Sequence, residues 1–546
     1  MIRRRSPRGD DSGIALVVVL MSMLMITAIL LTSLAYTVNN LQPARTDADG
    51  KAALAAAQAG IDDYVSRLTA DTNYWTNAGV DGTNPAFTTG QRVVTSGATF
   101  TYRVLSTTGS IQSTGAIKIM ATGTARTPSG VSISRTLYGT LRVAGFLDFI
   151  YLSDYEVADP SISGSASCGD YYYASTTAGS NRRAGNCSAY EIQWSGTDTV
   201  TGPFHSNDAL QITGATTFSN PQTESSWPAI VGMTTGKTWW GTQSAGTLPA
   251  YIPKYAAPIS LPSSNASLLN YVAPNMTGNA SLTTGPGCYY SGPTEIIFQG
   301  ASMRIRSPQT TQASTPAACY AVASASSWQT ITPIPAVIYV GAAGGSSCSG
   351  TNAGITYPLS GEVFTTGTPS AVAWSSGGGS PAYAVNYTCS RGTAYVQGTA
   401  NTSVTVASAD DVVVTGDLLV PSLSGGIAIG IIAGNAVWVY HPLSASNTSY
   451  ATFDPANNIN ASILALNHSF LVENSSRGTT LGALNITGAI AQRYRGPVGA
   501  TGGANCPVRC GYTKNYVYDS RLLALQPPYF LQPTVTPWRL TAVAGK

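Results

Sequence analysis

Eight cysteines are the residues whose number and spacing point most directly to chemistry, and all of them lie beyond residue 160. A metal site is disfavoured, because Cys506-x-x-x-Cys510 has only distant cysteine partners and the chain has only three histidines. Buried or free thiols are a further alternative. In an exported chain, disulfides that staple loops are favoured over both. Spacing does not determine connectivity, so sequential pairing is the simplest prediction: Cys168 with Cys187, Cys288 with Cys319, Cys348 with Cys389, and Cys506 with Cys510.

The three histidines, His205, His441 and His468, all stand in strand-rich phrases. Their spacing shows no metal-ligand signature, even when Asp208 is added. Each is therefore expected to be a corner residue that is hydrogen-bonded to the backbone. The sequence also contains no Gly-x-Ser-x-Gly elbow placed between a strand and a helix, no phosphate-binding loop and no dinucleotide fingerprint. We expect neither a metal nor a cofactor.

Clustered carboxylates with a basic residue would indicate a polysaccharide lyase or hydrolase, which β-helical folds can host. The candidates are Asp410, Asp411 and Asp417, with Arg493 and Arg495 further along. Adjacent Asp410 and Asp411 should point to opposite faces of a strand, which would prevent a catalytic dyad. We therefore expect turn residues and no catalytic site.

Aromatic residues supply one candidate for ligand contact. The phrase TWWGTQ contains Trp239 and Trp240, and exposed tryptophans are suited to stacking on sugars. These two residues are the predicted glycan contact.

Composition limits the possible functions of the chain. Only 10% of the 546 residues are charged, and the net charge of +3 is too balanced to indicate nucleic-acid binding. With 56 glycines and much Ser, Thr, Val and Tyr, the chain reads as strands and turns rather than as a disordered tract. The length allows two to four ordinary domains, or one long repetitive one.

The first apolar segment runs from Ile14 to Val38 without a charge, and its 25 residues exceed the roughly 7–15 of a secretory signal core. As a helix it would be roughly 37 Å long, enough to span a bilayer. Basic residues precede it, which predicts a cytoplasmic N-terminus and an extracellular body: Arg3, Arg4, Arg5 and Arg8. An uncleaved single-span anchor is one interpretation of this segment.

The same helix should continue beyond the membrane. Leu54, Ile61, Tyr64 and Leu68 have helical spacing in an alanine-rich stretch. Neither Pro43, which can kink a helix, nor Gly50, which weakens one, requires two separate helices. We predict one helix over residues 14–70, with a transmembrane first half.

The segment GIALVVVLM, followed by AALAAAQAGIDDYVSRL, resembles the N-terminus of type IV minor pilins of the PilX type, with a class III prepilin signal. The resemblance covers residues 9–70. It implies that a prepilin peptidase removes residues 1–13, cutting between Gly13 and Ile14, and that the new N-terminus is methylated. Major pilins mostly have Glu at the fifth mature position, where this chain has Val18. That departure favours a minor or tip subunit, with other pilin subunits and the inner assembly machinery as partners.

Residues 71–145 should form a small antiparallel sheet. Alternating apolar residues predict three strands, and turn signals at 108–110 and 128–130 separate them. The sheet needs a cover, and the amphipathic half of the N-terminal helix can supply it. A helix on such a sheet is pilin-like.

Residues 146–500 are predicted to form a β-solenoid, because apolar phrases with Asn, Asp or Gly at their corners recur every 20–30 residues or so. A β-sandwich with long loops is the alternative.

Residues 501–546, rich in aromatics and proline, should cap the body. Arg493 and Arg495 should anchor that segment, with Asp519 as partner of one of them. Several phrases, among them VWVYHP and ALNHSF, resemble stretches of uncharacterised bacterial surface proteins, a likeness that implies no activity.

Three functions follow from these features. The first is a structural role as a minor or tip pilin. The large body would crowd a filament in which every subunit carried one, but it fits at the end of a filament. Adhesion is an extension of this role. The second is a membrane-anchored polysaccharide enzyme. The third is a surface scaffold without a pilus. We expect the first, and no enzymatic activity.

Overall fold

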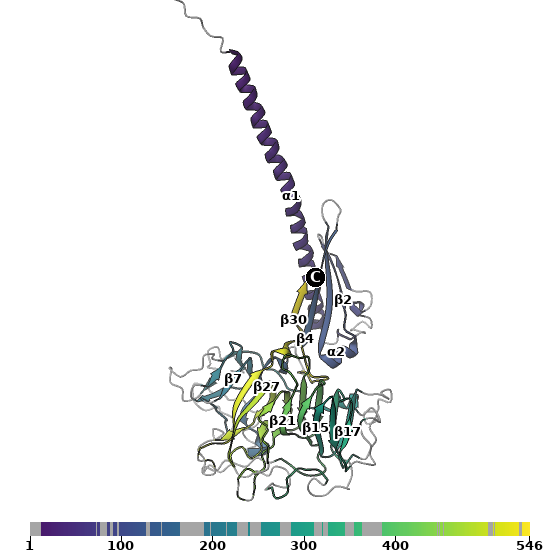
Figure 1. Cartoon of the computed structure of the whole chain (residues 1–546), viewed down its shortest axis with the longest axis vertical. Helices are drawn as coiled ribbons and strands as arrows, with labels where there is room; N and C mark the ends of the chain where they lie inside the picture. The colour runs from purple at the N-terminus through teal and green to yellow at the C-terminus, as the bar shows by residue number, and fades with distance from the viewer. Residues whose placement is uncertain are drawn as a thin grey trace, which may run out of the picture. The chain divides into compact units, whose positions relative to one another are not determined.

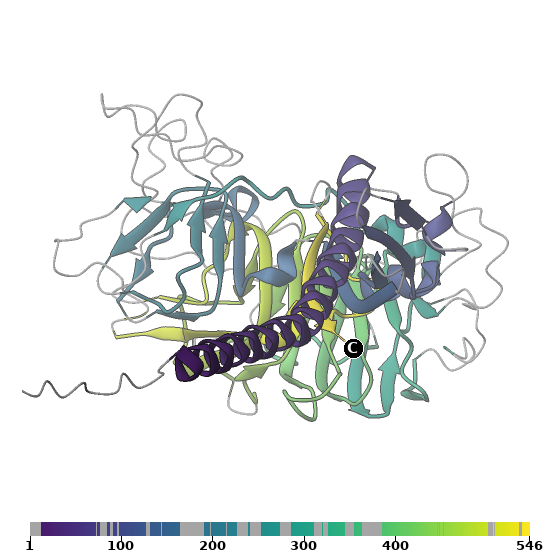
Figure 2. The ribbon, with the colours of Figure 1, turned by 90° about the horizontal axis from the view of Figure 1, so that it is seen from above.

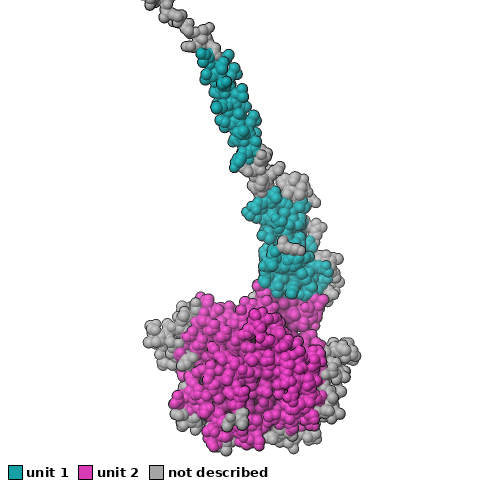
Figure 3. Space-filling model, in the orientation of Figure 1, with its two compact units in different colours: residues 1–106, 117–140, 542–546 teal, residues 107–116, 141–541 magenta. Residues whose placement is uncertain are grey.

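The structure is a computed structural model. It describes residues 12–71, 74–76, 84–87, 91–94, 98–126, 132–143, 145–163, 190–196, 198–213, 216–226, 239–240, 253–272, 286–310, 319, 326–343, 354–362, 385–444, 446, 448–450, 453–500, 506, 508–533 and 538–545. The chain divides into two compact units (Figure 3). Unit 1 comprises residues 1–106, 117–140 and 542–546, and unit 2 comprises residues 107–116 and 141–541.

Helix α1 (Ser12–Ala70) is one continuous helix, drawn unbroken in both ribbon views (Figures 1 and 2). It passes through Pro43 and Gly50 without ending. The predicted helix over residues 14–70 is therefore confirmed, with a start two residues earlier. Strand structure dominates the rest of the described chain.

Unit 1 contains α1 and a five-stranded sheet, where three strands were predicted. The order is β1-β2-β3-β4-β30, with bounds Gln91–Val94, Ala98–Val104, Ala116–Arg126, Ser132–Val143 and Trp538–Gly545. Strands β1 and β2 pair antiparallel, as do β2 and β3. Hydroxyl contacts Thr122–Thr136 and Thr124–Ser134, both 3.0 Å, fit an antiparallel β3–β4 pair. The extra strand β30 comes from the end of the chain.

The second half of α1 packs on this sheet. Ile61, Tyr64 and Leu68 are buried as predicted, whereas Leu54 is exposed because the buried stripe of the helix passes through its alanines instead. The Tyr102 hydroxyl donates to Asp63 Oδ2 at 2.6 Å, and Arg67 Nε donates to the same oxygen at 2.8 Å. The alanines of α1 therefore allow the helix to lie close to the sheet. The hydrogen bonds of Asp63 with Tyr102 and Arg67 fix the position of the helix along β2.

Two local predictions were wrong for capping and pairing reasons. The expected turn at 108–110 is the start of helix α2 (Thr108–Thr114), because Thr107 caps its N-terminus and Gly115, at φ 59°, ends it. The segment 501–546 does not act only as a cap. Its residues 510–518 form a paired strand, β29 (Cys510–Tyr518), and β30 joins the sheet of unit 1.

Unit 2 contains a 22-stranded sheet, whose strands lie side by side from β17 to β7 in Figure 1. Two series of parallel strands run through it. The first series is β14 (Gly287–Ser291), β18 (Val337–Gly341), β20 (Val404–Ser408), β22 (Ile429–Ala433), β25 (Ser462–Ala465), the second half of β27 (Thr480–Arg495), β5 (Tyr151–Ala158), β8 (Phe204–Ser206), β11 (Thr223–Ser225) and β13 (Lys254–Tyr255).

The second series alternates with the first along the chain. Its members are β15 (Thr294–Gly300), β19 (Ala394–Ala400), β21 (Val412–Leu419), β23 (Val437–Val439) with β24 (Asn458–Ile459), β26 (Phe470–Val472), the first half of β27, β29, β7 (Thr199–Thr201) and β10 (Thr217–Phe218). Strands β16 (Ser302–Arg306), β17 (Gln329–Ile331) and β28 (Gly499–Ala500) add antiparallel pairings. A separate three-stranded sheet comprises β6 (Trp194–Ser195), β9 (Leu210–Thr213) and β12 (Trp239–Trp240).

The spatial order of these strands differs from their order in the chain. The strands from β14 to β29 stack in chain order, and the strands from β5 to β13 follow after them. The two groups meet where β27 pairs with β5 and β29 pairs with β7. We call these two pairings the seam. Sequence periodicity predicts the strands but not this placement, because the stacking partner of a strand is not encoded locally.

An apolar core crosses the seam. Ile150 and Phe204, from early in unit 2, belong to the same buried cluster as Ile490, Tyr512 and Tyr516 from its end. Besides α2, the described residues of unit 2 include the short helical segments η2 (Phe146–Asp148), α3 (Pro160–Ser163), η5 (Ala266–Leu268), α4 (Leu269–Val272) and η9 (Ser520–Leu523).

Candidate functional site

The apolar half of α1 is the most exposed hydrophobic feature of the described chain. Residues Ile14–Thr37 have a mean hydropathy of 2.9 and none of this window is buried. A helix of this length and composition can cross a membrane, and a signal sequence would have the same properties. Gly13 and Ile14, the predicted cleavage site, lie within the first turn of α1, and Val18 is exposed.

The histidines do not share one arrangement. His441 Nδ1 lies 3.2 Å from the Glu473 carbonyl oxygen, which is the backbone contact predicted for all three. His205 instead contacts the side chains of Asn207 and Glu224, at 3.0 and 3.3 Å. His468 Nδ1 lies 2.8 Å from Asp159 Oδ2. Among the described residues, no group of three or more His, Cys, Asp or Glu side chains is arranged to hold a metal.

The carboxylates of Asp410 and Asp411 reach the same cation, which corrects the prediction that they point apart. Arg391 Nη2 lies 3.0 Å from Asp410 Oδ1 and 3.2 Å from Asp411 Oδ2. The two residues stand at the corner between β20 and β21, where the strand alternation no longer applies. Their remaining oxygens accept backbone N–H groups from Gly392 and Ala436. The expectation of turn residues fits Asp410 and Asp411. It is wrong for Asp417, which lies within β21 and accepts two backbone N–H groups, from Asn457 and Asn458.

The predicted ion pairs of Asp519 were wrong. Asp519 pairs with its near neighbour Arg521 at 2.6 Å, because Asp519 caps the N-terminus of helix η9 and Arg521 lies in its first turn. Arg493 lies over the rings of Tyr155 and Tyr494. Arg495 turns inward and makes contacts across the seam.

Arg495 belongs to a buried cluster that the sequence analysis missed. Its Nη1 donates to Glu156 Oε2 at 2.8 Å, and both side chains are 1% exposed. The same oxygen accepts the Trp194 indole N–H at 3.2 Å, and Glu156 Oε1 accepts the hydroxyls of Ser153 and Tyr151. The guanidinium carbon lies 3.9 Å from the centre of the Trp194 ring. One signal was available: Glu156 stands in a strand of mostly apolar and aromatic residues, in a chain with only six glutamates.

A second buried cluster brings two carboxyl groups together. Tyr387 Oη lies 3.2 Å from Glu362 Oε1 and 3.0 Å from Glu473 Oε1. The Tyr440 hydroxyl and the Leu359 amide donate to Glu362 Oε2. The amides of Val385 and His441 donate to Glu473. The side chains come from a loop before the gap at 363–384, from the segment after it, and from the ends of β23 and β26.

Both carboxyls of this pair bind protons more tightly than an exposed glutamate does. Burial raises the pKa of Glu362 to about 7. Burial, followed by the charge of Glu362, raises the pKa of Glu473 well above its usual range. Tyr387 has a single proton to donate and faces both carboxyls. Tyr387 can donate to only one of the two carboxyls, so a proton on a carboxyl supplies the second hydrogen bond. We call Glu362, Glu473 and Tyr387 the clamp, because their hydrogen bonds hold the segments around Leu359 and Val385 together.

We predict that this clamp weakens as the pH rises. Both folded-state pKa values exceed the unfolded value near 4.5, so the stabilisation is complete below about pH 4.5 and is lost as the pH rises through the folded values. While one extra proton is held, the loss is about 1.4 kcal/mol per pH unit. His441 opposes this trend at low pH, because burial lowers its pKa to about 4. The measurement is hydrogen exchange of the amides after residue 384, from pH 5 to 8, in the wild type and in Glu473→Gln. His441 is present in both proteins, so the comparison cancels its contribution to the pH dependence. Equal pH slopes in the two proteins would refute the clamp.

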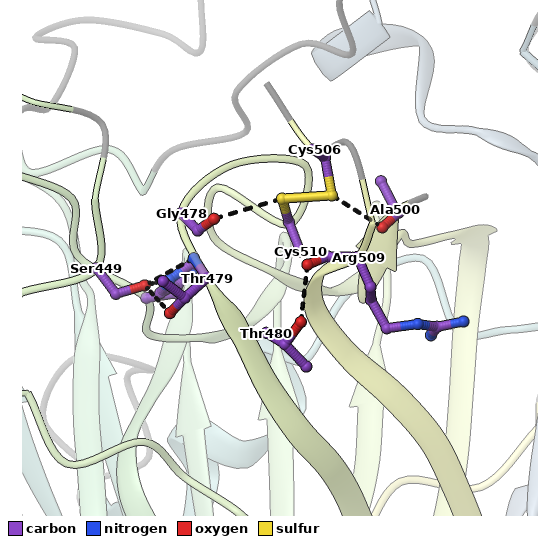
Figure 4. The surroundings of a disulfide bond; sticks show 9 residues. Ser449, Gly478, Thr479, Thr480, Ala500, Cys506, Arg509 and Cys510 are labelled. Carbon is purple, nitrogen blue, oxygen red and sulfur yellow. Dashed lines mark hydrogen bonds between the residues drawn. A yellow bond between two sulfur atoms is a disulfide. The ribbon is translucent and has the colours of Figure 1, made fainter. Parts of the chain in front are cut away.

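Two disulfides lie between described residues, Cys288–Cys319 and Cys506–Cys510, and each joins sequential cysteines. Figure 4 shows the second, at the start of β29, with Cys510 Sγ 3.5 Å from the Gly478 oxygen and Cys506 Sγ 3.1 Å from the Ala500 oxygen.

Several other predicted sites lie wholly or partly outside the described residues. Cys389 is also disulfide-bonded and buried. Its predicted partner Cys348, and both Cys168 and Cys187, lie outside the described residues. Trp239 and Trp240 form β12, which pairs with β9, but their side chains are not described. The glycan contact stays a prediction.

No protein-family model matches the chain, and no curated protein sequence matches it. Among solved structures, the chain is similar to the crystal structure of the competence-associated pilin ComZ from Thermus thermophilus, with 12% sequence identity and a TM-score of 0.32 over 91% of this chain and 97% of that one. A likeness at this level assigns neither a fold nor a function.

Proposed function

We propose that the chain is a minor or tip subunit of a type IV pilus-like or pseudopilus assembly, with a structural rather than an enzymatic role. The observation that carries this proposal is the division of α1 into two halves. Its first half exposes a 24-residue apolar segment, and its second half buries Ile61, Tyr64 and Leu68 against an antiparallel sheet.

The exposed half needs an apolar environment, since a stretch of this size is unfavourable in water. A membrane supplies that environment before assembly, and the helices of neighbouring subunits supply it afterwards. The prepilin-like junction at Gly13 and Ile14 supports the same sequence of events, because cleavage there would leave the apolar helix at the very start of the mature chain.

Unit 2 is proposed to be a β-solenoid that projects from the assembly. Two alternating series of parallel strands, in which successive strands pair along the stack, support this interpretation over a β-sandwich. Unit 2 spans residues 107–116 and 141–541, a body large enough to crowd a filament in which every subunit carried one. A tip or other minor position avoids that crowding.

The first experiment is coexpression of the full chain with a prepilin peptidase, followed by mass spectrometry of the N-terminus. We expect the mature chain to begin at Ile14. Gly13→Leu should block processing, because the resemblance places the scissile bond directly after this glycine. Gly9→Leu, a glycine substitution within the same leader, should be processed normally. An intact leader on the wild-type chain, with the peptidase active on a control substrate, would refute the proposal and leave a simple anchor.

The carboxyl pair Glu362–Glu473 favours a second candidate, a polysaccharide-active enzyme. Two carboxyls within reach of one hydroxyl, both with a raised pKa, resemble the carboxyl pair of a glycosidase. Their residues are however only 6% and 0% exposed, and most of their oxygens accept protein hydrogen bonds. This burial favours the clamp over a site that a glycan could enter. A surface scaffold without a pilus is distinguished by the processing experiment.

A further inference from the structure

The seam contains a second buried ion pair besides Glu156–Arg495. Lys514 Nζ lies 3.0 Å from Asp198 Oδ2, and the two side chains are 12% and 6% exposed. Lys514 lies in the middle of β29, on the face shared by the buried residues Tyr512 and Tyr516. Asp198 directly precedes Thr199, which pairs with Asn515 across the seam. The parallel register therefore sets the amine and the carboxyl opposite each other.

The surroundings favour the uncharged form of the lysine amine. Lys514 Nζ lies 5.1 Å from the centre of the Trp194 ring, and the Arg495 cation lies against the same ring. Burial lowers the pKa of Lys514, and the charge of Arg495 lowers it further, against the opposing effect of Asp198. A desolvated lysine beside another cation is an activated nitrogen nucleophile. Proton transfer from the ammonium to the carboxylate gives a neutral amine facing a neutral carboxylic acid.

We propose that Lys514 and Asp198 condense into an intramolecular amide, a covalent cross-link across the seam. The lone pair of neutral Nζ attacks the side-chain carboxyl carbon of Asp198. A C–N bond forms, a C–O bond breaks, and the hydroxyl leaves with one amine proton as water. No oxidant or other reactant is needed. The amide replaces two buried charges by one neutral group, which removes the desolvation cost of the ion pair.

The position of the cross-link gives it a use. The two residues are 316 positions apart, and the strands that they join come from the two ends of unit 2. Without a covalent link, noncovalent contacts hold β29 against β7. In a surface protein under tension, an amide at this pairing would prevent the group of strands from β14 to β29 from separating from the group from β5 to β13. The use rests on the proposed surface location, whereas the formation of the amide does not depend on the proposed function.

The test is peptide mapping of the folded, full-length wild-type chain after reduction, alkylation and trypsin digestion. An unmodified chain gives linear peptides 184–237, 510–514 and 515–521. The cross-linked chain gives one branched peptide instead, 510–521 joined to 184–237, lighter by one water and uncleaved at Lys514. We expect the branched product to dominate. It should be lost in Lys514→Gln and in Asp198→Ala.

The chain offers a matched internal control. Lys51 Nζ and Asp47 Oδ2 are 2.8 Å apart, but their side chains are 76% and 67% exposed. This pair has the same chemistry without the burial, so trypsin should cleave after Lys51 in the same digest. If the wild-type chain gives linear peptides of full mass at Lys514 as well, the proposal is overturned, and Lys514–Asp198 is an ion pair only. That result would leave the processing prediction at Gly13 unaffected.

Discussion

Glu156→Gln is expected to lower the free energy of unfolding of unit 2 by about 3–5 kcal/mol, because it leaves the buried Arg495 cation without its counter-charge. Glutamine has nearly the same shape, so the loss reports charge rather than volume. Both residues are 1% exposed, and Arg495 has turned away from solvent toward the Trp194 ring. Glu156 also accepts the indole N–H and two hydroxyls, so four donors lose an ionised acceptor together.

The measurement is urea unfolding of the full chain in detergent, with hydrogen exchange of peptides from β5 and β27 to assign the loss to unit 2. Replacing both partners, Glu156→Leu with Arg495→Met, should cost less than Glu156→Gln alone, since no buried charge then remains unpaired. Lys51→Ala removes one partner of the exposed Lys51–Asp47 pair and should leave the unfolding midpoint unchanged. If Glu156→Gln behaves like Lys51→Ala, the buried pair does not stabilise the seam.

Gly123→Ala is expected to destabilise unit 1 by about 1–3 kcal/mol, although alanine is only one methyl group larger. A Cβ at Gly123 would collide with backbone atoms of Ala53, Ala56 and Ala57 in α1. Backbone atoms cannot rotate aside as a side chain can, so the helix must move away from the sheet. That movement would open the packing around Tyr64 and lengthen the Tyr102–Asp63 hydrogen bond.

Hydrogen exchange of the α1 peptides covering residues 52–68 measures this loss directly. The matched control is Gly109→Ala, because a Cβ at Gly109 meets nothing within 4 Å. Gly109 lies within α2, where alanine is favoured over glycine by roughly 0.5–1 kcal/mol, so the control should stabilise. Unchanged protection of α1 in Gly123→Ala would show that the helix is not held at this contact.

Periodicity predicted much of the fold. An uncharged run, followed by Ile61, Tyr64 and Leu68 at helical spacing, was enough to predict α1, because a helix repeats on a length that the sequence displays. Alternation predicted β2, β3 and β4 in the same way. It could not predict β30, because the pairing of Trp538–Gly545 with a strand some 400 residues earlier leaves no local trace.

The buried ion pairs were harder to predict for the same reason. The sequence predicts Arg495 as an anchor for the C-terminal segment, since sequence spacing cannot show that β27 lies beside β5. Glu362 and Glu473 stand in no catalytic motif. Their importance comes from desolvation, which depends on segments more than 80 residues apart meeting at Tyr387. A charge within an apolar strand, as at Glu156, is the one local signal that could have identified such a cluster.

The seam has a consequence for the order of folding. Arg495 and Glu156 are separated by 339 residues, and Lys514 and Asp198 by 316. Strands β14 to β27 can stack as soon as each has emerged, because each pairs with a recent predecessor. Strands β5 to β13 are made first, yet β5 and β7 must wait for β27 and β29, almost the last part of unit 2 to be synthesised. Contacts of such sequence separation form slowly. The early strands therefore remain an unfinished edge until synthesis is nearly complete, and a chain cut short before β27 could not close its seam.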